Sequence, residues 1–497
     1  MRSTKEFIKD GLLLTFTSLI LRTAGVFFSA RLSAIAGNAV MGLYTQIMSV
    51  YAFAVTAASA GVNLGAMRIT SECLGSGNED KLSNAVRSCV KYCLTVGIAV
   101  ALINFSAAPF IGIKIIGREE AVAPLQALSL ALPFISLSNA FHGYFNGVKM
   151  ISQSAVTSLF EQTVRIISTI VCLEYFSECS IKTLCLILVI CNASSEALSF
   201  LVLYIFYRIS KRKLPKQCNL TNYQRKRFLA ITVPIALSAL IRSALTTLEH
   251  ILIPIGLRAS GMNSDGALAK YGIVSGMVIP ILLYPMALLS SFASITISEL
   301  SARVSSGEAT EKIKKTVTKG ITLTMIYGIG CTVIIGAFSE QLGLAIYKSS
   351  EASDFLRILA PLIIFMYLDH ISDGMLKGLD KQNYVMKINI ADAALSVLFA
   401  MILIPRLGIY GFIISLYICE CMNCFFSFGK LFLMLKPNID LFSSALMPFA
   451  CAVVSCGAVT VLGGIGLPTT IAIITAISFY LLLLRICGSL TENYGKT

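Results

Sequence analysis

The sequence predicts an all-α, polytopic membrane protein with about fourteen transmembrane helices. The chain of 497 residues is 56% hydrophobic and only 13% charged. Apolar runs of about 20 residues, the length that spans a bilayer, recur along it. Lysine and arginine, 40 against 26 acidic residues, gather in the short polar segments between these runs. This distribution excludes a soluble domain and is typical of membrane-flanking charge rather than of a nucleic-acid interface.

Six apolar runs make up the first half of the chain, and we expect one helix in each. The fourth and fifth are joined by a very short turn at Lys149. Gly143 and Gly147, at the end of the fourth, form a G-x-x-x-G pair, which allows two helix backbones to approach closely in lipid. The six predicted helices cover 10–36, 40–70, 86–107, 121–147, 151–176 and 183–207.

A basic segment, 208–228, follows and contains no acidic residue. Because lysine and arginine mark the cytoplasmic side of a membrane, we expect this segment and both termini in the cytoplasm, with short loops outside. Six more helices are then predicted, followed by two that stand apart. They cover 229–256, 267–298, 317–338, 355–376, 385–404 and 409–434, then 441–463 and 467–486.

The second half of the chain repeats the plan of the first. Ser18-Leu-Ile-Leu-Arg22-Thr-Ala is similar to Ser238-Ala-Leu-Ile-Arg242-Ser-Ala, at the same place in each half. Six crossings return a chain to the side where it started, so the repeat is parallel. We therefore predict an N-terminal six-helix lobe at 1–207, a cytoplasmic linker at 208–228, a C-terminal six-helix lobe at 229–436, and two extra helices with a cytoplasmic tail at 437–497.

Charged side chains inside the apolar runs are the main functional signal. Each costs roughly 2.5–3.5 kcal/mol at mid-helix, so it usually faces a partner or a water-filled cavity. Glu161 and Arg165 are four residues apart on one helix face, and they form either a structural pair or part of a substrate site. Arg22 and Arg242 recur at equivalent places. The other candidates are Arg31, Glu196, Glu249, Asp392 and Glu420, with Asp369, His370 and Asp373 nearer a helix end.

These charges favour an anionic ligand in the first half of the chain. Guanidinium groups bind phosphate through paired hydrogen bonds, so a cavity lined by Arg22, Arg31 and Arg165 would receive an anionic head group. The 15 cysteines, scattered through apolar runs, are interpreted as small buried side chains. We predict no metal site and no cofactor, and the acidic residues at mid-helix are candidates for coupling to H⁺, Na⁺ or the membrane potential.

Two local motifs resemble a known family. Gly143-Tyr-Phe-Asn-Gly147 and Glu161-Gln-Thr-Val-Arg165-Ile are similar to the stage V sporulation protein B branch of the MOP (multidrug/oligosaccharidyl-lipid/polysaccharide) flippases, and the resemblance extends over nearly the whole chain. It implies two lobes that rock around a central cavity. The cargo would be a lipid-linked oligosaccharide or peptidoglycan precursor, moved in the cell membrane for wall or spore-cortex synthesis.

The roles of the charged residues rest on their mid-helix positions, and only the lipid-tail role of the last two helices comes from the resemblance. The substrate head group would meet Arg22, Arg242, Arg165, Glu161, Glu196 and Arg31. The coupling candidates are Glu249, Asp392 and Glu420, and the last two helices would hold the lipid tail. We expect a monomer without enzymatic activity, whose partners are the bilayer and the lipid-linked glycan.

Three other functions stay open. A cation-coupled exporter of small cationic compounds shares the twelve-helix plan and would use the acidic residues of the second half. A membrane-embedded glycan polymerase or acyltransferase would need a large outward loop, and the predicted outward loops are short. A non-transporting partner of the cell-wall machinery would differ from a flippase only in its activity in vesicles.

Overall fold

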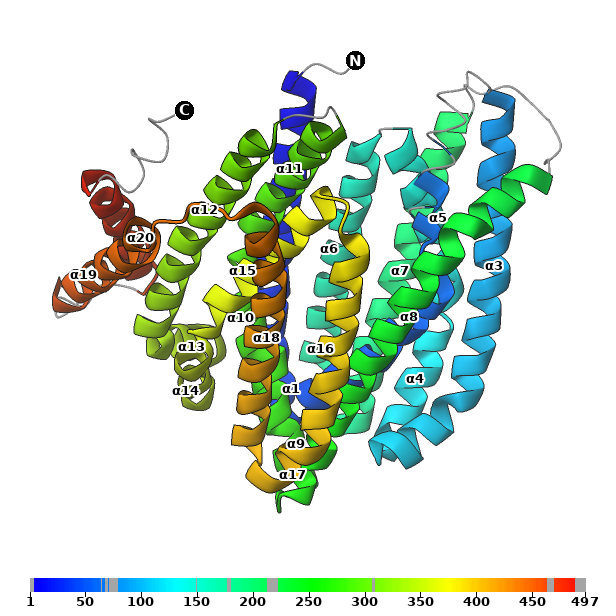
Figure 1. Ribbon diagram of the computed structural model, residues 1–497. Coiled ribbons are helices and arrows are strands. Elements are labelled where there is room, and N and C mark those ends of the chain that lie inside the picture. The colour runs from blue at the N-terminus through cyan, green and yellow to red at the C-terminus, as the bar shows by residue number, and fades with distance from the viewer. Residues whose placement is uncertain are drawn as a thin grey trace. The chain divides into compact units, whose positions relative to one another are not determined.

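The computed structural model describes residues 4–487 apart from 64, 68–69, 71–78, 149, 177–179, 212–221, 306–308 and 463–468. Every regular element in this part of the chain is a helix (Figure 1), and the predicted all-α class is confirmed. Helices satisfy their own backbone polar groups, which lipid requires. The turn at Lys149, the middle of the basic linker and the C-terminal tail lie outside the described residues.

The first compact unit comprises Met1–Ala24 and Arg31–Gly272. Its first element, α1 (Thr4–Ser59), is broken at Gly37, where φ is 81° and ψ is 168°. Glycine adopts a positive φ at little steric cost, and this break lies at the predicted boundary between helices 10–36 and 40–70. The other elements are α3 (Glu79–Pro109), η1 (Phe110–Ile116), η2 (Glu119–Ala121), α4 (Val122–Ser129), α5 (Leu132–Gly147), α6 (Ile151–Tyr175), α7 (Ile181–Lys211), α8 (Asn222–Ala259) and α9 (Ser264–Tyr271).

The crossing formed by η2–α4 and α5 is bent by 45°. The bend lies just before Pro133, whose ring removes a helical hydrogen-bond donor. Further along α5, a Cβ atom at Gly143 would lie 2.5 Å from the backbone oxygen of Asn63, and one at Gly147 would lie 2.6 Å from Cβ of Thr70. The predicted close approach of two helices at this glycine pair is therefore confirmed.

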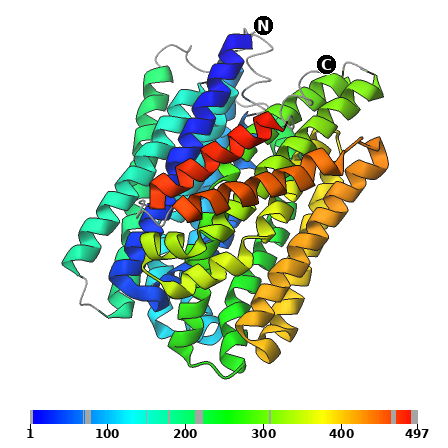
Figure 2. The same ribbon diagram turned by 90° about the vertical axis from the view of Figure 1, so that its left-hand side faces the viewer.

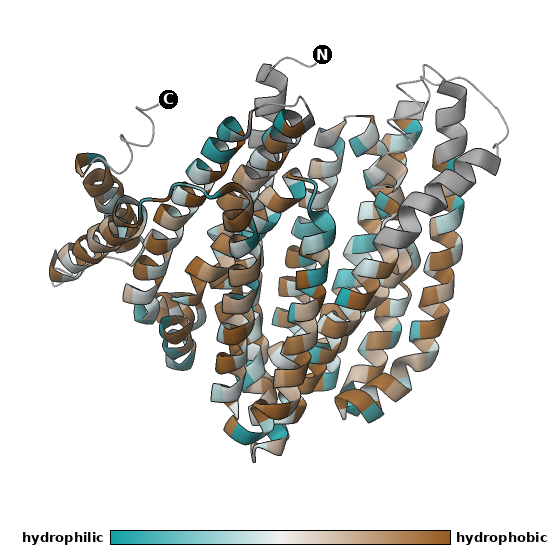
Figure 3. Cartoon of the chain, in the orientation of Figure 1, coloured by the Kyte–Doolittle hydropathy of each residue, from teal (hydrophilic) through white to brown (hydrophobic). Residues whose placement is uncertain are grey.

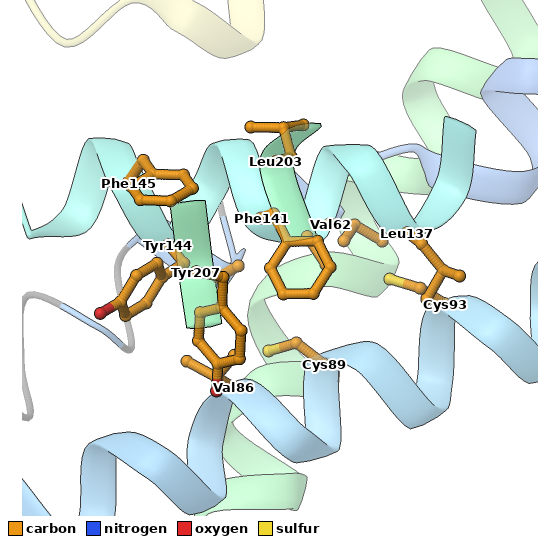
Figure 4. Packing of buried hydrophobic residues seen from close by; sticks show 12 residues of the cluster. Val62, Val86, Cys89, Cys93, Leu137, Phe141, Tyr144, Phe145, Leu203 and Tyr207 are labelled. Carbon is orange, nitrogen blue, oxygen red and sulfur yellow. The ribbon is translucent and has the colours of Figure 1, made fainter. Parts of the chain in front are cut away.

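Aromatic and small side chains hold α3, α5 and α7 together (Figure 4). The ring centroids of Phe141 and Tyr207 are 5.0 Å apart, and those of Tyr144 and Tyr207 are 5.3 Å apart. Cys89 and Cys93 are buried in the same cluster. The cysteines that the structure describes are free thiols; eight of them are buried, as predicted, while Cys172, Cys331 and Cys421 are half-buried and Cys487 is exposed.

The second compact unit comprises Gly25–Ala30 and Ile273–Thr497. It contains the other bent crossing, in which α14 (Ser350–Leu359) meets α15 (Leu362–Gly378) at 56°. The elements are η3 (Gly272–Val278), α10 (Ile279–Leu283), α11 (Met286–Ser305), α12 (Thr310–Ala337), α13 (Ser339–Tyr347), α14 (Ser350–Leu359), α15 (Leu362–Gly378), α16 (Gln382–Ile402), α17 (Ile404–Leu407), α18 (Ile409–Leu435), η4 (Phe442–Leu446), α19 (Met447–Leu462) and α20 (Thr469–Ile486).

The segment from η3 to α11 is a broken helix. Pro285 lacks a backbone N–H, and the helix is interrupted there between α10 and α11. Backbone carbonyls around such a break need internal donors in lipid, and tyrosine hydroxyls from later helices supply them. The three bonds run from Tyr347 to Met277 O (3.2 Å), from Tyr367 to Leu282 O (2.9 Å) and from Tyr327 to Pro285 O (2.8 Å).

The last two long helices, α19 and α20, lie side by side and pack on α12 (Figure 2). Tyr480 of α20 donates a hydrogen bond to the backbone oxygen of Ile326 at 2.7 Å. Its ring lies against Gly330, where an added Cβ would be 2.5 Å from the nearest ring carbon. A glycine on α12 thus provides the space in which α20 docks.

Eleven helices among the described residues are long and apolar enough to cross a membrane, or thirteen if each bent pair is one crossing. One of them, Leu19–Ser59, contains the break at Gly37 and covers two predicted helices. The apolar colouring of Figure 3 extends along the helices of both units. The chain is therefore a multi-pass membrane protein, compatible with fourteen crossings. The unit boundary at Gly272 lies inside a predicted helix, and the division into lobes at 1–207 and 229–436 stays a prediction.

Candidate functional site

A polar cluster lies between α6 and α7 of the first unit, and its Glu161 and Arg165 side chains are half-buried. Glu161 and Arg165 share one face of α6, but their closest N–O distance is 4.0 Å, the outer limit of an ion pair. Each is instead bonded to α7. Arg165 Nη1 donates to Asn192 Oδ1 at 3.1 Å, and Ser199 Oγ donates to Glu161 Oε2 at 3.1 Å. These two bonds fix both charged groups against the neighbouring helix.

Glu196 adds a second carboxylate to the cluster. It is buried on α7, one turn beyond Asn192, and lies within electrostatic range of both Glu161 and Arg165. Asn192, Glu196 and Ser199 share one helix face, because residues three and four apart are neighbours on a helix. The cluster therefore contains two carboxyl groups and one guanidinium, rather than the arginine surplus that the first half as a whole suggests.

Tyrosines of α1 complete the cluster. The Tyr51 hydroxyl is buried, has no hydrogen-bond partner, and lies within electrostatic range of Glu196, Glu161 and Arg165. Tyr44 lies within range of Arg165. The amide nitrogen of Asn192 is also buried and unpartnered. Buried donors are rarely left unpaired in folded proteins, so these two are available to an incoming acceptor.

The structure brings only part of the predicted substrate set together. Glu161, Arg165 and Glu196 lie in the α6–α7 cluster. Arg22 and Arg31 lie on α1 and Arg242 on α8, with Arg31 and Arg242 exposed. Their roles remain predictions.

A second polar cluster lies among α15, α16 and α18 of the second unit. Asp373 accepts hydrogen bonds from Asn389 Nδ2 at 2.9 Å and from Ser427 Oγ at 3.0 Å. Asp369 accepts one from Asn423 Nδ2 at 3.3 Å. The remaining carboxylate oxygen of Asp369 and the amide oxygen of Asn423 are buried without a partner. The Asp369 carboxylate oxygen can take up a proton, and together with the Asn423 amide oxygen it can coordinate a cation.

The coupling candidates divide between the two units. Asp392 on α16 lies within electrostatic range of Asp369, and so belongs to the second cluster. Glu420 is one turn before Asn423 on α18, and Glu249 lies on α8 of the first unit. Among the described residues, no three His, Cys, Asp or Glu side chains are placed to hold a metal ion together.

Tyr51, Asn192 and Ser199 belong to this candidate site but are not among the residues predicted from the sequence. A usable signal existed for two of them, since Asn192, Glu196 and Ser199 follow helical spacing inside an apolar run. Tyr51 gives no such signal, because tyrosines are expected near the ends of membrane helices whether or not they bind a ligand.

The fold and these clusters define a class of protein. Long apolar helices that bury charged groups and unpartnered donors, with breaks at Gly37 and Pro285, are typical of membrane transporters. The polysaccharide biosynthesis protein family matches residues 7–286, more than half of the chain, and this protein belongs to that family. The MatE family matches residues 228–402.

Two proteins of Bacillus subtilis (strain 168) are similar to this chain. Stage V sporulation protein B is 20% identical over 414 residues, which cover 82% of this chain and 80% of that protein. Sporulation protein YkvU is 21% identical over 421 residues, which cover 83% and 92%. The predicted resemblance to the sporulation protein branch is confirmed.

Solved structures show the same fold. An inward-facing multidrug resistance MATE family transporter of the MOP superfamily has a TM-score of 0.65 at 16% identity, with 86% of this chain and 99% of that chain covered. The lipid II flippase MurJ in an inward closed conformation also has a TM-score of 0.65, at 14% identity, with 96% and 99% covered. The family and these neighbours are transport proteins, not enzymes, as predicted.

Proposed function

We propose that this protein is a flippase that moves a polyprenyl-pyrophosphate glycan from the inner to the outer leaflet by alternating access. The observation that carries the proposal is a set of donors in the first unit: the half-buried Arg165 and the buried, unpartnered Asn192 amide and Tyr51 hydroxyl. Phosphate and sugar oxygens are acceptors that such donors recognise. The similarity to Stage V sporulation protein B and to a lipid II flippase supports this class of cargo.

We also assign the predicted arginines to this pathway. Arg22 and Arg242 recur at equivalent places in the repeat and would contact the phosphates as the head group passes mid-membrane. Lysine keeps the charge but loses the planar fork of donors. Arg22→Lys should therefore be made at the parent level yet transport poorly, and Arg22→Ala should transport less still. Parent transport by Arg22→Ala at equal protein level would remove this residue from the pathway.

The direct test uses purified protein in vesicles. A fluorescent undecaprenyl-pyrophosphate glycan is placed in one leaflet, and its appearance in the other is followed by a membrane-impermeant quencher. A flippase accelerates the exchange over empty vesicles, and Arg165→Ala should abolish the acceleration. Exchange equal to that of empty vesicles would contradict the proposal and favour a non-transporting partner of wall synthesis.

One alternative has specific support. The acidic cluster of the second unit and the two carboxyl groups beside Arg165 are also suited to a cation-coupled exporter of small cations. The same vesicles distinguish the two functions when loaded with a fluorescent cationic dye under an imposed Na⁺ or H⁺ gradient. Dye export without glycan exchange would select the exporter.

We place coupling to the driving ion at the Asp369 and Asp373 cluster, with Asp392 and Glu420 nearby. The Asp369 oxygen and the Asn423 oxygen without partners would receive a proton or Na⁺. Asp373→Asn should lower the dependence of transport on the ion gradient, while leaving the slow exchange that needs no gradient. An unchanged gradient dependence would exclude this cluster from coupling. We further propose a monomer with both termini in the cytoplasm.

A further inference from the structure

Three helix tips that the topology predicts on the outward side meet within the first unit. They are the break at Gly37, the segment from η1 to η2, and the turn between α8 and α9. The first two precede the basic linker and the third follows it, so the contact joins the two halves of the sequence repeat. In a transporter that works by alternating access, the two halves of the repeat have to move apart at such a contact.

The backbones touch where α1 passes α9 and the start of η3. A Cβ atom at Gly42 would lie 2.0 Å from the backbone oxygen of Leu268. One at Gly272 would lie 2.6 Å from the backbone oxygen of Asn38 and 2.7 Å from the nitrogen of Gly42. Contacts under 3.0 Å cannot be accommodated without moving backbone, so only glycine fits at both positions. At these two glycines the backbones touch directly, with no side chain between them.

Side-chain hydrogen bonds extend this contact along α1 and α8. We call the whole interface, from Asn38 and Gly42 against Leu268 and Gly272 to the side-chain bonds below, the seam. Gln46 Nε2 donates to the backbone oxygen of Ile251 at 3.4 Å, and Thr247 Oγ1 donates to that of Ser49 at 3.0 Å. Gln46 and Thr247 are buried. Each bond is a single contact between a side chain and a backbone carbonyl, and such contacts are weak enough to exchange with water on opening.

Two arginines close the seam at its end. Arg118 Nη2 donates to Ser264 Oγ at 2.9 Å and pairs with Asp265, while Arg258 Nη2 donates to the backbone oxygen of Ile116 at 3.2 Å. Arg118 is 12% exposed and Asp265 is 64% exposed. The ion pair is therefore accessible to water on one side, where it can break without leaving a buried charge.

We propose that this seam is the closed outward gate: the Gly42–Gly272 backbone contact seals it, and the Arg118–Asp265 pair latches it. The proposal rests on the proposed transport by alternating access, but it concerns the resting conformation and needs no substrate to be tested. Weakening the seal or the latch should therefore shift the protein toward an outward-open state.

The test uses a cysteine reporter inside the seam of the full-length protein. Ile251→Cys keeps the backbone oxygen that accepts the Gln46 bond and places a thiol at a buried position of α8. Its modification by an impermeant maleimide is measured on intact cells by peptide mass spectrometry. The native cysteines serve as internal references. We expect slow modification in the reporter alone. Adding Gly272→Ala should increase it roughly five-fold or more, a typical size for a shifted conformational equilibrium.

Gly272→Ala could raise modification simply by misfolding the protein, so two further variants test the gate without changing a glycine. Asp265→Asn changes only an exposed side chain and should also raise modification of the reporter. The exchange Arg118→Asp with Asp265→Arg should bring it back toward the parent value. Gly457→Ala is the matched control, because nothing lies within 4 Å of an added Cβ there, and it should change nothing.

Unchanged modification in both the Gly272→Ala and the Asp265→Asn backgrounds, at parent protein levels, would overturn the gate. So would rapid modification in the reporter alone, or modification in inverted vesicles but not in cells. These outcomes are separate from the transport test. A gate that responds as expected in a protein that moves no lipid-linked glycan would leave the gate standing and reject the flippase.

Discussion

At the scale of single residues, Arg165 and Glu161 are bonded to different partners on α7 rather than tightly to each other. Removing either one therefore leaves a polar group on α7 without its partner, and this is costly in an apolar interior. The sequence left a structural pair and a substrate site as alternatives. The geometry favours a network in which each charge is held by an amide or a hydroxyl.

Arg165→Gln should lower the free energy of unfolding by about 1–3 kcal/mol, because two carboxyl groups lose their cation. The double change Glu161→Gln/Arg165→Gln should recover much of this, since one of the uncompensated acids is gone. The measurement is thermal melting of detergent-solubilised protein. If the double variant is as unstable as the single one, Glu161 and Arg165 are not energetically coupled.

Tyr51→Phe separates folding from binding. The hydroxyl has no partner, so its removal should change stability by less than about 0.5 kcal/mol, yet it should reduce glycan transport if the group contacts the cargo. Tyr367→Phe is the matched control, because its hydroxyl bonds Leu282 O and its loss should cost about 1 kcal/mol. Full transport by Tyr51→Phe would exclude this hydroxyl from the site.

At the scale of helices, glycine contacts set how closely elements pack. Gly143 on α5 and Gly330 on α12 each lie where an added Cβ would be 2.5 Å from a neighbour. The G-x-x-x-G pattern made the first predictable from sequence alone. The contact at Gly330 has no sequence motif, because it depends on where Tyr480 of α20 packs in the folded protein. Local patterns therefore predict close contacts only where both small residues lie on one helix.

Gly143→Ala should destabilise the protein by about 1–3 kcal/mol, because the added methyl group meets the backbone of Asn63, which cannot rotate away. Gly429→Ala, with nothing within 4 Å, should be neutral or slightly stabilising. Protein yield and melting temperature in the same detergent compare the two. Equal stability of the variants would mean that α5 shifts easily, against the close packing described.

At the scale of the whole chain, composition and apolar run length predicted the all-α class and most helix boundaries, including the break at Gly37. They could not predict the partners of Arg165. Asn192 is 27 residues away in sequence, and the register between α6 and α7 is set by packing along both helices. Arg22, Arg31 and Arg242 were grouped by charge and repeat position, which does not fix where a long side chain lies.

Topology is tested by two cysteines that lie outside the described residues. Cys179 is predicted in an outward turn and Cys218 in the cytoplasmic linker. In variants that keep only one of these thiols, an impermeant reagent on intact cells should label Cys179 and spare Cys218. The reverse pattern would invert the orientation derived from the lysine and arginine distribution.

The broken helix around Pro285 has a consequence for how the protein is made. The carbonyls of Met277, Leu282 and Pro285 are synthesised before the tyrosines that bond them, which come from α12, α13 and α15. Until those helices emerge from the ribosome, the break exposes polar backbone that lipid cannot solvate. The broken helix around Pro285 must therefore stay in a hydrated or protein-lined environment until those tyrosines have been synthesised. Truncations that end before Tyr327 should stay bound to the insertion machinery, and those that end after Tyr367 should be released.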